Sequence, residues 1–421
     1  DLVRSRGLGD VYKRQFHGRI LDPACGSGGM FVQSADFVQR SNANPDNISV
    51  YGIEKEGETV KLARMNMFLH GLNNHIVHGN SYYSDPHNSY GAFDFVMANP
   101  PFNVDDVSYD KVKDDRRFNE YGVPKNKTKS KSKDSETVPN ANYLWINQFA
   151  AALNDTGRAA LVMASIATDA GKSEAEIRAR LVEDGIVSSM LSLPSNMFYS
   201  VTLPATLWFF DKARRDDKRV LFINARNTYR QIDRAHREFT DEHIANLVCI
   251  RHLYQGNEVQ WHLLMSHYDM QISELTKKYE DAVDENNSIN SEAENFLIKN
   301  PNKNLTQDLK KRLATSNTEV EESKAELEYM VSMRQWLIDN FPEGKYRDVI
   351  GLCKAATIEE IREQDYSLNP GRYVGVSFDI EDKNDFQESM LLLRDELLLL
   401  NGRSQELMSS IMSNLENTIG I

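Results

Sequence analysis

The sequence predicts an α/β fold, in which an open, doubly wound sheet is followed by a helical C-terminal region with a coiled-coil-like insert. Three observations favour this fold. Short apolar runs alternate with helical patterns from residue 16 to about residue 210. A glycine-rich turn, residues 22–29, lies between the first apolar run and the first helical pattern. Beyond about residue 253 the chain becomes charged, with apolar residues three and four positions apart.

The first four strands are predicted where apolar runs end in polar residues. The runs are Ile20-Leu21 before Asp22, Val50 to Ile53 before Glu54, Ile76 to His78 before Gly79-Asn80, and Phe93 to Ala98 before Asn99. The carboxyl ends of parallel strands lie at one edge of an open sheet, and ligands bind beyond that edge. We therefore expect the four polar residues Asp22, Glu54, Asn80 and Asn99 to converge on one site.

The second half of the sheet is predicted after a polar, lysine-rich loop over residues 103–140. Beyond this loop we expect a helix over 141–153, a strand over 159–163, a helix over 174–183 and a strand over 186–193. The apolar runs 206–210 and 220–224 are interpreted as a terminal antiparallel pair of strands.

The C-terminal region is predicted to be helical. Apolar residues spaced as in a coiled-coil seam occur at Tyr268, Ile272, Leu275 and Tyr279, and again at Leu309, Leu313, Val320 and Leu327. A polar turn is expected around 286–304, which makes the two runs compatible with an antiparallel helical hairpin. A closing helix carries an apolar stripe of Phe386, Met390, Leu393, Leu397 and Leu400.

These patterns divide the chain into four segments. Residues 1–15 show no period and are interpreted as unstructured or non-native. Residues 16–253 form the α/β domain, 254–345 the helical insert, and 346–421 the C-terminal helical region.

The composition narrows the class of protein. Three well-separated cysteines, Cys25, Cys249 and Cys353, argue against a disulfide framework and a metal-ligand cluster. The sequence has no apolar run that could span a bilayer and no signal-peptide pattern. We therefore expect a cytoplasmic protein. The formal net charge of −13 indicates that the chain does not bind nucleic acid over its whole surface.

The glycine turn and Glu54 together suggest a nucleoside-containing ligand. Glycines allow a backbone to approach a ligand closely, and the following helix N-terminus offers free N–H groups. A carboxylate just after the second strand is placed to accept both hydroxyls of a ribose. The alternative for Glu54 is a solvated acid that stabilises a helix start.

The sequence Asn99-Pro100-Pro101-Phe102, termed here the acceptor loop, suggests chemistry on a planar amino group such as adenine N6. The Asn99 side-chain oxygen and the Pro100 carbonyl supply two hydrogen-bond acceptors for the amino hydrogens. The prolines stiffen the loop, and Phe102 is available to stack on a flipped base. The alternative is a Pro-Pro turn with Phe102 in the core.

Together, the glycine turn, Glu54 and the acceptor loop resemble S-adenosylmethionine-dependent N6-adenine DNA methyltransferases. More narrowly, they resemble the modification subunits of type I restriction–modification systems. The resemblance covers about residues 16–245 and resumes at 355–373, and it includes the segments 193–198, 221–225, 232–234 and 368–373. That family also has a helical N-terminal domain and a Phe-x-Thr-Pro-like segment before the glycine turn, neither of which is recognisable here. We therefore expect the chain by itself to bind cofactor weakly and not to methylate DNA.

The resemblance implies a Rossmann-like methyltransferase sheet and methyl transfer to adenine N6 in duplex DNA, without a metal. It assigns the catalytic roles to Asn99, Pro100, Pro101 and Phe102. It assigns S-adenosylmethionine binding to Asp22, Pro23, Gly26, Ser27, Gly28, Gly29, Glu54 and Asn80. The implied partners are a sequence-specificity subunit, which the closing helix would join, a second modification subunit and a restriction subunit.

Two other functions remain open from the sequence. Related enzymes use a similar Asn-Pro-Pro-aromatic loop to methylate RNA or a protein glutamine, although they usually have Tyr at the position of Phe102. A truncated or assembly-only subunit is the non-enzymatic alternative.

The loop beyond Phe102 has two interpretations, phosphate binding or a mobile solvated segment. Its cations are Lys111, Lys113, Arg116, Arg117, Lys125, Lys127, Lys129, Lys131 and Lys133.

Overall fold

A computed structural model describes residues 18–40, 44, 47–125, 136–198, 203–214, 218–233, 236–301, 304–376 and 408. The chain divides into two compact units, Asp1–Gly375 and Val376–Ile421, and the first of them contains the sheet. The expected non-native segment 1–15 and the apolar stripe of the closing helix lie outside the described residues.

The first unit is built on a nine-stranded sheet with the order β11-β8-β6-β7-β5-β4-β1-β2-β3. The strands are β1 (Gly18–Asp22), β2 (Ile48–Glu54), β3 (Asn74–His78), β4 (Phe93–Ala98), β5 (Leu153–Ala164), β6 (Val187–Ser192), β7 (Ala205–Asp211), β8 (Val220–Asn224) and β11 (Cys353–Ala356). Strands β3, β2, β1, β4 and β5 are mutually parallel. The predicted α/β sheet is confirmed, and its first four strands end at or beside the polar residues Asp22, Glu54, Asn80 and Asn99.

The expected antiparallel pairing of 206–210 with 220–224 is wrong. Strand β7 lies between β5 and β6 and is antiparallel to both. Strand β8 is instead parallel to β6 and pairs with β11 on its other side. The internal position gives β7 hydrogen-bonding partners along both edges and buries Trp208 and Phe210 almost completely.

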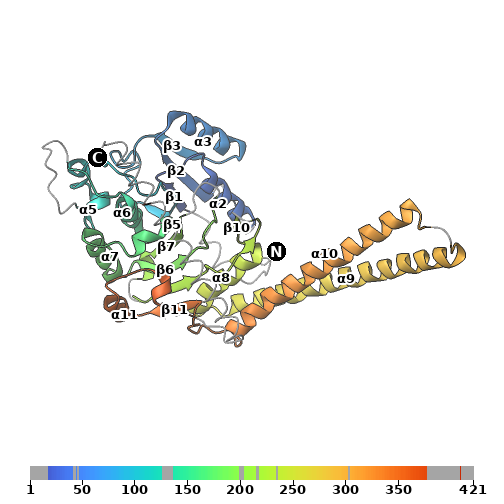
Figure 1. Cartoon of the computed structure of the whole chain (residues 1–421). Coiled ribbons are helices and arrows are strands. Elements are labelled where there is room, and N and C mark those ends of the chain that lie inside the picture. The colour runs from blue at the N-terminus through green and yellow to red at the C-terminus, as the bar shows by residue number, and fades with distance from the viewer. Residues whose placement is uncertain are drawn as a thin grey trace, which may run out of the picture. The chain divides into compact units, whose positions relative to one another are not determined.

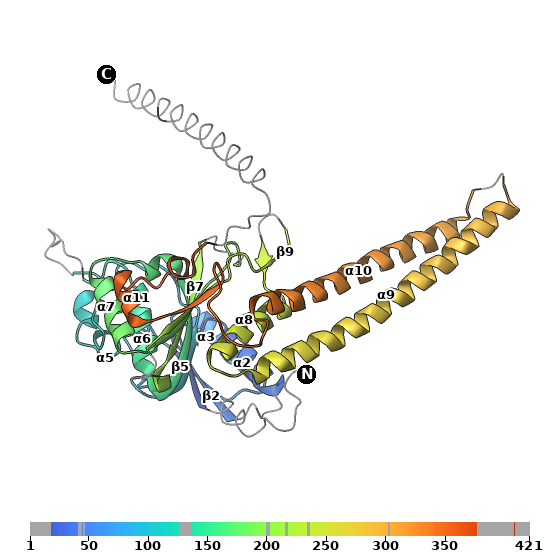
Figure 2. The same cartoon turned by 90° about the horizontal axis from the view of Figure 1, so that it is seen from below.

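Helices cover both faces of the sheet (Figure 1, Figure 2). One face carries α6 (Asn142–Ala152), α7 (Ser173–Glu183) and α11 (Ile358–Glu363), which share the main apolar core with β4 to β8. The other face carries α2 (Gly29–Arg40) and α3 (Gly57–Leu69) over β1 to β3, and α8 (Asp241–Tyr254) over β6 and β8. Short elements complete the unit: α4 (Tyr109–Val112), α5 (Arg116–Asn119), η2 (Ser165–Thr168), η3 (Lys212–Arg214), η4 (Pro370–Arg372) and the pair β9 (Arg230–Gln231) and β10 (Arg237–Glu238).

The helical hairpin is confirmed, but its expected turn is wrong. Helices α9 (Val259–Lys299) and α10 (Gln307–Asn340) run side by side (Figure 2). Helix α9 continues through the polar stretch near residue 286, where Asn286 donates a 2.7 Å hydrogen bond to Asn317 of α10. Beyond it, Ile289 and Ala293 pack against Leu309, so the apolar seam resumes and keeps the helix intact.

Two further observations concern the residues that the structure describes. No helix among them is long and apolar enough to cross a membrane. The three cysteines are buried and unbonded to one another.

Candidate cofactor and acceptor site

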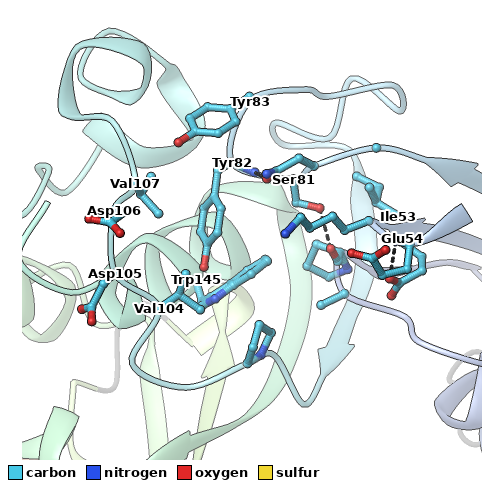
Figure 3. A pocket seen from close by; sticks show the side chains of 17 residues that line it. Ile53, Glu54, Ser81, Tyr82, Tyr83, Val104, Asp105, Asp106, Val107 and Trp145 are labelled. Atoms are coloured by element: carbon cyan, nitrogen blue, oxygen red, sulfur yellow. Dashed lines mark hydrogen bonds between the residues drawn. The ribbon is translucent and has the colours of Figure 1, made fainter. Parts of the chain in front are cut away.

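The carboxyl ends of β1 to β4 surround a pocket of about 510 Å³. Its walls come from residues 23–24 after β1, 53–56 at the end of β2, 79–83 after β3, Pro101 and 104–107 after β4, and Trp145 of α6. Figure 3 shows Ile53 and Glu54 on one side of the pocket and Asp105 and Asp106 on the other, with Tyr82 and Trp145 between. Of the predicted site residues, Pro23, Glu54, Asn80 and Pro101 line this pocket.

Glu54 connects the ends of the first two strands. Its Oε2 atom accepts a hydrogen bond from the Gly26 N–H at 3.1 Å, and its Oε1 atom accepts one from the Glu56 N–H at 2.8 Å. Each carboxylate oxygen can accept more than one hydrogen bond, so both oxygens retain capacity for a ligand. Because Glu54 also lines the pocket, its side chain is available to hydroxyl groups there.

The glycines of the turn differ in their backbone conformation and in the space around them. Gly28 has φ +81°, and a Cβ atom built on it would lie 2.8 Å from the Met67 Cε atom of α3. The positive φ favours glycine here, and any larger side chain would also have to displace the end of the Met67 side chain. Cβ atoms built on Gly26 and Gly29 would meet nothing within 4 Å, so space beside both residues is open. Ser27 is exposed beside them.

Asp22 lies beneath the turn. It is 2% exposed, does not line the pocket, and its Oδ1 atom accepts a hydrogen bond from the Ala24 N–H at 2.9 Å. Burial raises the pKa of Asp22 to about 7, the bond from Ala24 opposes this, and the nearby negative charge of Glu54 adds to the rise. The structure therefore gives Asp22 a supporting contact to the turn.

Asn80 organises the turn after β3. Its Oδ1 atom accepts a hydrogen bond from the Tyr82 N–H at 3.0 Å, and its backbone oxygen accepts one from the Ser84 N–H at 2.9 Å. The turn places Tyr82 against Trp145, with ring centroids 4.7 Å apart. These two rings form an aromatic wall that sequence reasoning missed, because their separation of some sixty positions leaves no local pattern.

Arg117 of α5 is a buried support of the same turn. Its Nη1 atom donates to the carbonyl oxygens of Ser81 at 2.9 Å and Ser84 at 3.0 Å. Its Nη2 atom contacts the Asp115 carboxylate at 2.7 Å. The guanidinium is thereby engaged on both sides, and the residue is only 3% exposed. The interpretation of Arg117 as a phosphate-binding cation is therefore wrong; in the sequence nothing separates it from Arg116.

The acceptor loop follows β4 directly. Asn99 is exposed and its side chain makes no hydrogen bond to another described residue, whereas Pro100 is buried. Pro101 is exposed on the pocket wall, and Phe102 is half-buried against the main core. The loop thus combines a fixed backbone with an accessible amide side chain.

Backbone hydrogen bonds join the two described ends of the segment beyond the acceptor loop. Val138 N–H donates to the Val107 oxygen at 2.9 Å, and Ala141 N–H donates to the Val104 oxygen at 3.0 Å. These bonds hold 104–107 over the pocket. Residues 126–135, which carry Lys127, Lys129, Lys131 and Lys133, lie outside the description.

No group of three or more His, Cys, Asp or Glu residues in the described part of the chain is arranged to hold a metal ion.

A doubly wound sheet with a glycine turn, a carboxylate after β2 and a polar loop after β4 at one edge defines the Rossmann-like methyltransferase class. The chain belongs to the N-6 DNA methylase family, whose model matches residues 7–287 and 295–382.

Named relatives agree with this family. The type I restriction enzyme MjaIX methylase subunit of Methanocaldococcus jannaschii is 28% identical over 401 residues, which cover 95% of this chain and 55% of the relative. The HindI methylase subunit of Haemophilus influenzae is 27% identical over 402 residues, which cover 95% of this chain and 68% of the relative. The chain thus spans about half to two thirds of the length of these two relatives. The resemblance to type I modification subunits is confirmed.

A solved structure supports the fold. The type I restriction–modification methyltransferase subunit from Streptococcus thermophilus superposes with a TM-score of 0.53 and 21% identity. The match covers 85% of this chain and 54% of that structure.

Proposed function

We propose that this chain is the modification subunit of a type I restriction–modification complex and transfers a methyl group from S-adenosylmethionine to adenine N6 in duplex DNA. One observation carries the proposal: Glu54 and Pro101 line the same pocket. A carboxylate suited to a ribose and a loop suited to an amino group thus border one cavity, as transfer between two bound molecules requires.

The residues of the pocket fit S-adenosylmethionine. The two Glu54 oxygens match a ribose diol, and Asn80 with the Tyr82–Trp145 wall provides polar and flat apolar surfaces for adenine. The open space beside Gly26 and Gly29 suits the methionine end. We assign that end to Asp22, Pro23, Gly26, Ser27, Gly28 and Gly29, with Asp22 acting through the turn that it supports. The bound cofactor supplies an electrophilic methyl group.

The acceptor loop would activate the amino group. The N6 lone pair of adenine is delocalised into the ring, which makes N6 a poor nucleophile. Hydrogen bonds from N6 to the Asn99 side-chain oxygen and the Pro100 carbonyl favour a tetrahedral nitrogen with a localised lone pair. Pro101 stiffens the loop, and the accessible part of Phe102 is available to stack on the flipped base. This step relies on placement and hydrogen bonding, so we propose no metal requirement.

Sequence recognition is proposed to come from a partner. A DNA duplex is negatively charged and attracts cationic surfaces, whereas this chain has a net charge of −13. A specificity subunit would supply the target sequence and much of the phosphate binding, and a second modification subunit and a restriction subunit would complete the complex. We propose a cytoplasmic location for this assembly.

The test uses the chain assembled with its specificity subunit and unmethylated duplex DNA. After incubation with S-adenosylmethionine, digestion to nucleosides and mass spectrometry should reveal N6-methyladenine. Asn99→Ala and Phe102→Ala should abolish or strongly reduce this product while leaving cofactor binding by calorimetry unchanged. Asn73→Ala is the matched control and should keep full activity, because Asn73 is exposed just before β3, at the opposite edge of the sheet.

Other outcomes identify the other functions. Methylcytosine, or methylation of RNA or of a protein glutamine, would assign the chain to another class of methyltransferase. An absence of cofactor binding by the folded complex would favour an assembly-only subunit.

A further inference from the structure

Asn103, the residue after the acceptor loop, has a backbone conformation that needs support. Its φ is +54°, in the left-handed region that most side chains avoid and that asparagine tolerates better than most. The chain changes direction here, between the acceptor loop and the segment 104–107 that covers the pocket. The contacts that hold Asn103 therefore set the positions of the acceptor loop and of residues 104–107.

Asn142 contacts Asn103 through both ends of its amide group. The Asn142 Oδ1 atom accepts a hydrogen bond from the Asn103 N–H at 2.8 Å. The Asn142 Nδ2 atom donates to the Asn103 Oδ1 atom at 2.9 Å. A third asparagine completes the arrangement, since Asn140 Nδ2 donates to Asn103 Oδ1 at 3.0 Å and Asn140 Oδ1 accepts from the Asn142 N–H at 2.8 Å.

The anchor of this cluster is rigid. Asn142 is the first residue of α6 and is 3% exposed, and every residue of α6 is buried. The same helix supplies Trp145 to the pocket wall. Asn103 itself is exposed, so the buried Asn142 holds an exposed turn in place.

We propose that Asn142 is a positioning residue for methyl transfer, acting through Asn103 to fix the direction of the acceptor loop. The inference rests on the proposed function. While position 103 is asparagine, the Asn142 amide suits this role because its oxygen accepts from the Asn103 N–H and its nitrogen donates to the Asn103 Oδ1. An aspartate retains the acceptor but places a second acceptor oxygen against Asn103 Oδ1.

The first experiment compares glycine and alanine at position 103 in the assembled complex. Glycine adopts φ +54° without strain, and its N–H still bonds to Asn142, so Asn103→Gly should retain kcat within about threefold. Alanine has neither the conformational freedom nor the side-chain oxygen. Asn103→Ala should lower kcat tenfold to about a hundredfold, with the KM for cofactor changed much less, because small misplacements of a reacting group are costly. The same pair of substitutions at exposed Asp365, φ +52°, is the control and should leave kcat unchanged.

The second experiment tests Asn142 directly. Asn142→Asp should lower kcat as Asn103→Ala does, and adding Asn103→Gly should restore it by removing the opposing oxygen. Amide hydrogen exchange over residues 99–107 should speed up in Asn142→Asp and return toward the original rate in the double variant. This readout does not depend on turnover.

The outcomes separate the inference from the proposed function. Absence of adenine methylation by the unsubstituted complex would overturn the proposed function, and hydrogen exchange would then report on the asparagine cluster alone. The inference is overturned if Asn103→Gly is as slow as Asn103→Ala, or if the folded Asn142→Asp complex keeps the original kcat and exchange rates.

Discussion

The Gly26 N–H donates a 3.1 Å hydrogen bond to the Oε2 atom of Glu54, which lies 28 positions later in the chain. The bond ties the glycine turn after β1 to the end of β2. It also orients the carboxylate at the pocket wall, where the second oxygen is held by the Glu56 N–H. Glu54 is therefore both a support of the turn and a wall of the pocket.

Substitution of Glu54 should weaken cofactor binding. Loss of a charged hydrogen-bond acceptor costs about 1.5–3 kcal/mol, which corresponds to roughly a tenfold to hundredfold loss of affinity. Glu54→Gln keeps one oxygen for the turn and should have the smaller effect, whereas Glu54→Ala loses both contacts. Titration calorimetry measures the affinity, and circular dichroism confirms the fold. Equal affinity in a folded Glu54→Ala variant would refute the ribose assignment.

Substitution of Arg117 should destabilise the turn after β3 that forms part of the pocket wall. Arg117→Met leaves the carbonyl oxygens of Ser81 and Ser84 without their donor and Asp115 without its cation. We expect a loss of about 2–3 kcal/mol in the free energy of unfolding, together with weaker cofactor binding. Urea denaturation and calorimetry measure the two effects.

The neighbouring Arg116 provides the control for this experiment. Its guanidinium carbon lies 3.9 Å from the centre of the exposed Tyr90 ring. Arg116→Met should change the free energy of unfolding by about 1 kcal/mol or less, since cation–π pairs at exposed sites contribute little. Equal effects of the two substitutions would argue against the supporting role of Arg117.

Asp22 should make stability depend on pH. Burial raises its pKa from 3.8 to about 7, so between these values the folded protein binds more protons than the unfolded chain does. The contribution of Asp22 to the free energy of unfolding therefore falls as pH rises through this window. Asn at this position cannot titrate, so Asp22→Asn should lessen the decline seen in urea denaturation across the window. A parallel pH dependence in both proteins would show that another group is responsible.

The closing helix is predicted to join the specificity subunit. Its apolar stripe, residues 386–400, is too large for a lone terminal helix to expose to water. Leu393→Asp with Leu397→Asp should abolish co-purification with that subunit and preserve cofactor binding. Glu388→Lys with Asp395→Lys, which the helical period would place opposite the stripe, tests whether a change of charge alone has this effect. Loss of the fold in the leucine variant would instead indicate packing within this chain.

The sequence by itself determined the local elements and the edge at which the predicted site residues meet. Apolar runs ending at Asp22 and Glu54 matched β1 and β2, because strand periodicity and the polar residues that follow are properties of short segments. The side-by-side hairpin of α9 and α10 was predictable for the same reason, since helix-period seams such as Tyr268 and Ile272 are local.

Only the tertiary structure decided which segments meet across long separations. It put β7 between β5 and β6, where Trp208 is buried, and it buried Arg117 while Arg116 remained at the surface. It also placed Asn142 against Asn103. These arrangements depend on contacts between residues that are far apart in the sequence, through burial of apolar side chains and pairing of polar groups. Such contacts form only in the folded chain, and no short segment carries a pattern that predicts them.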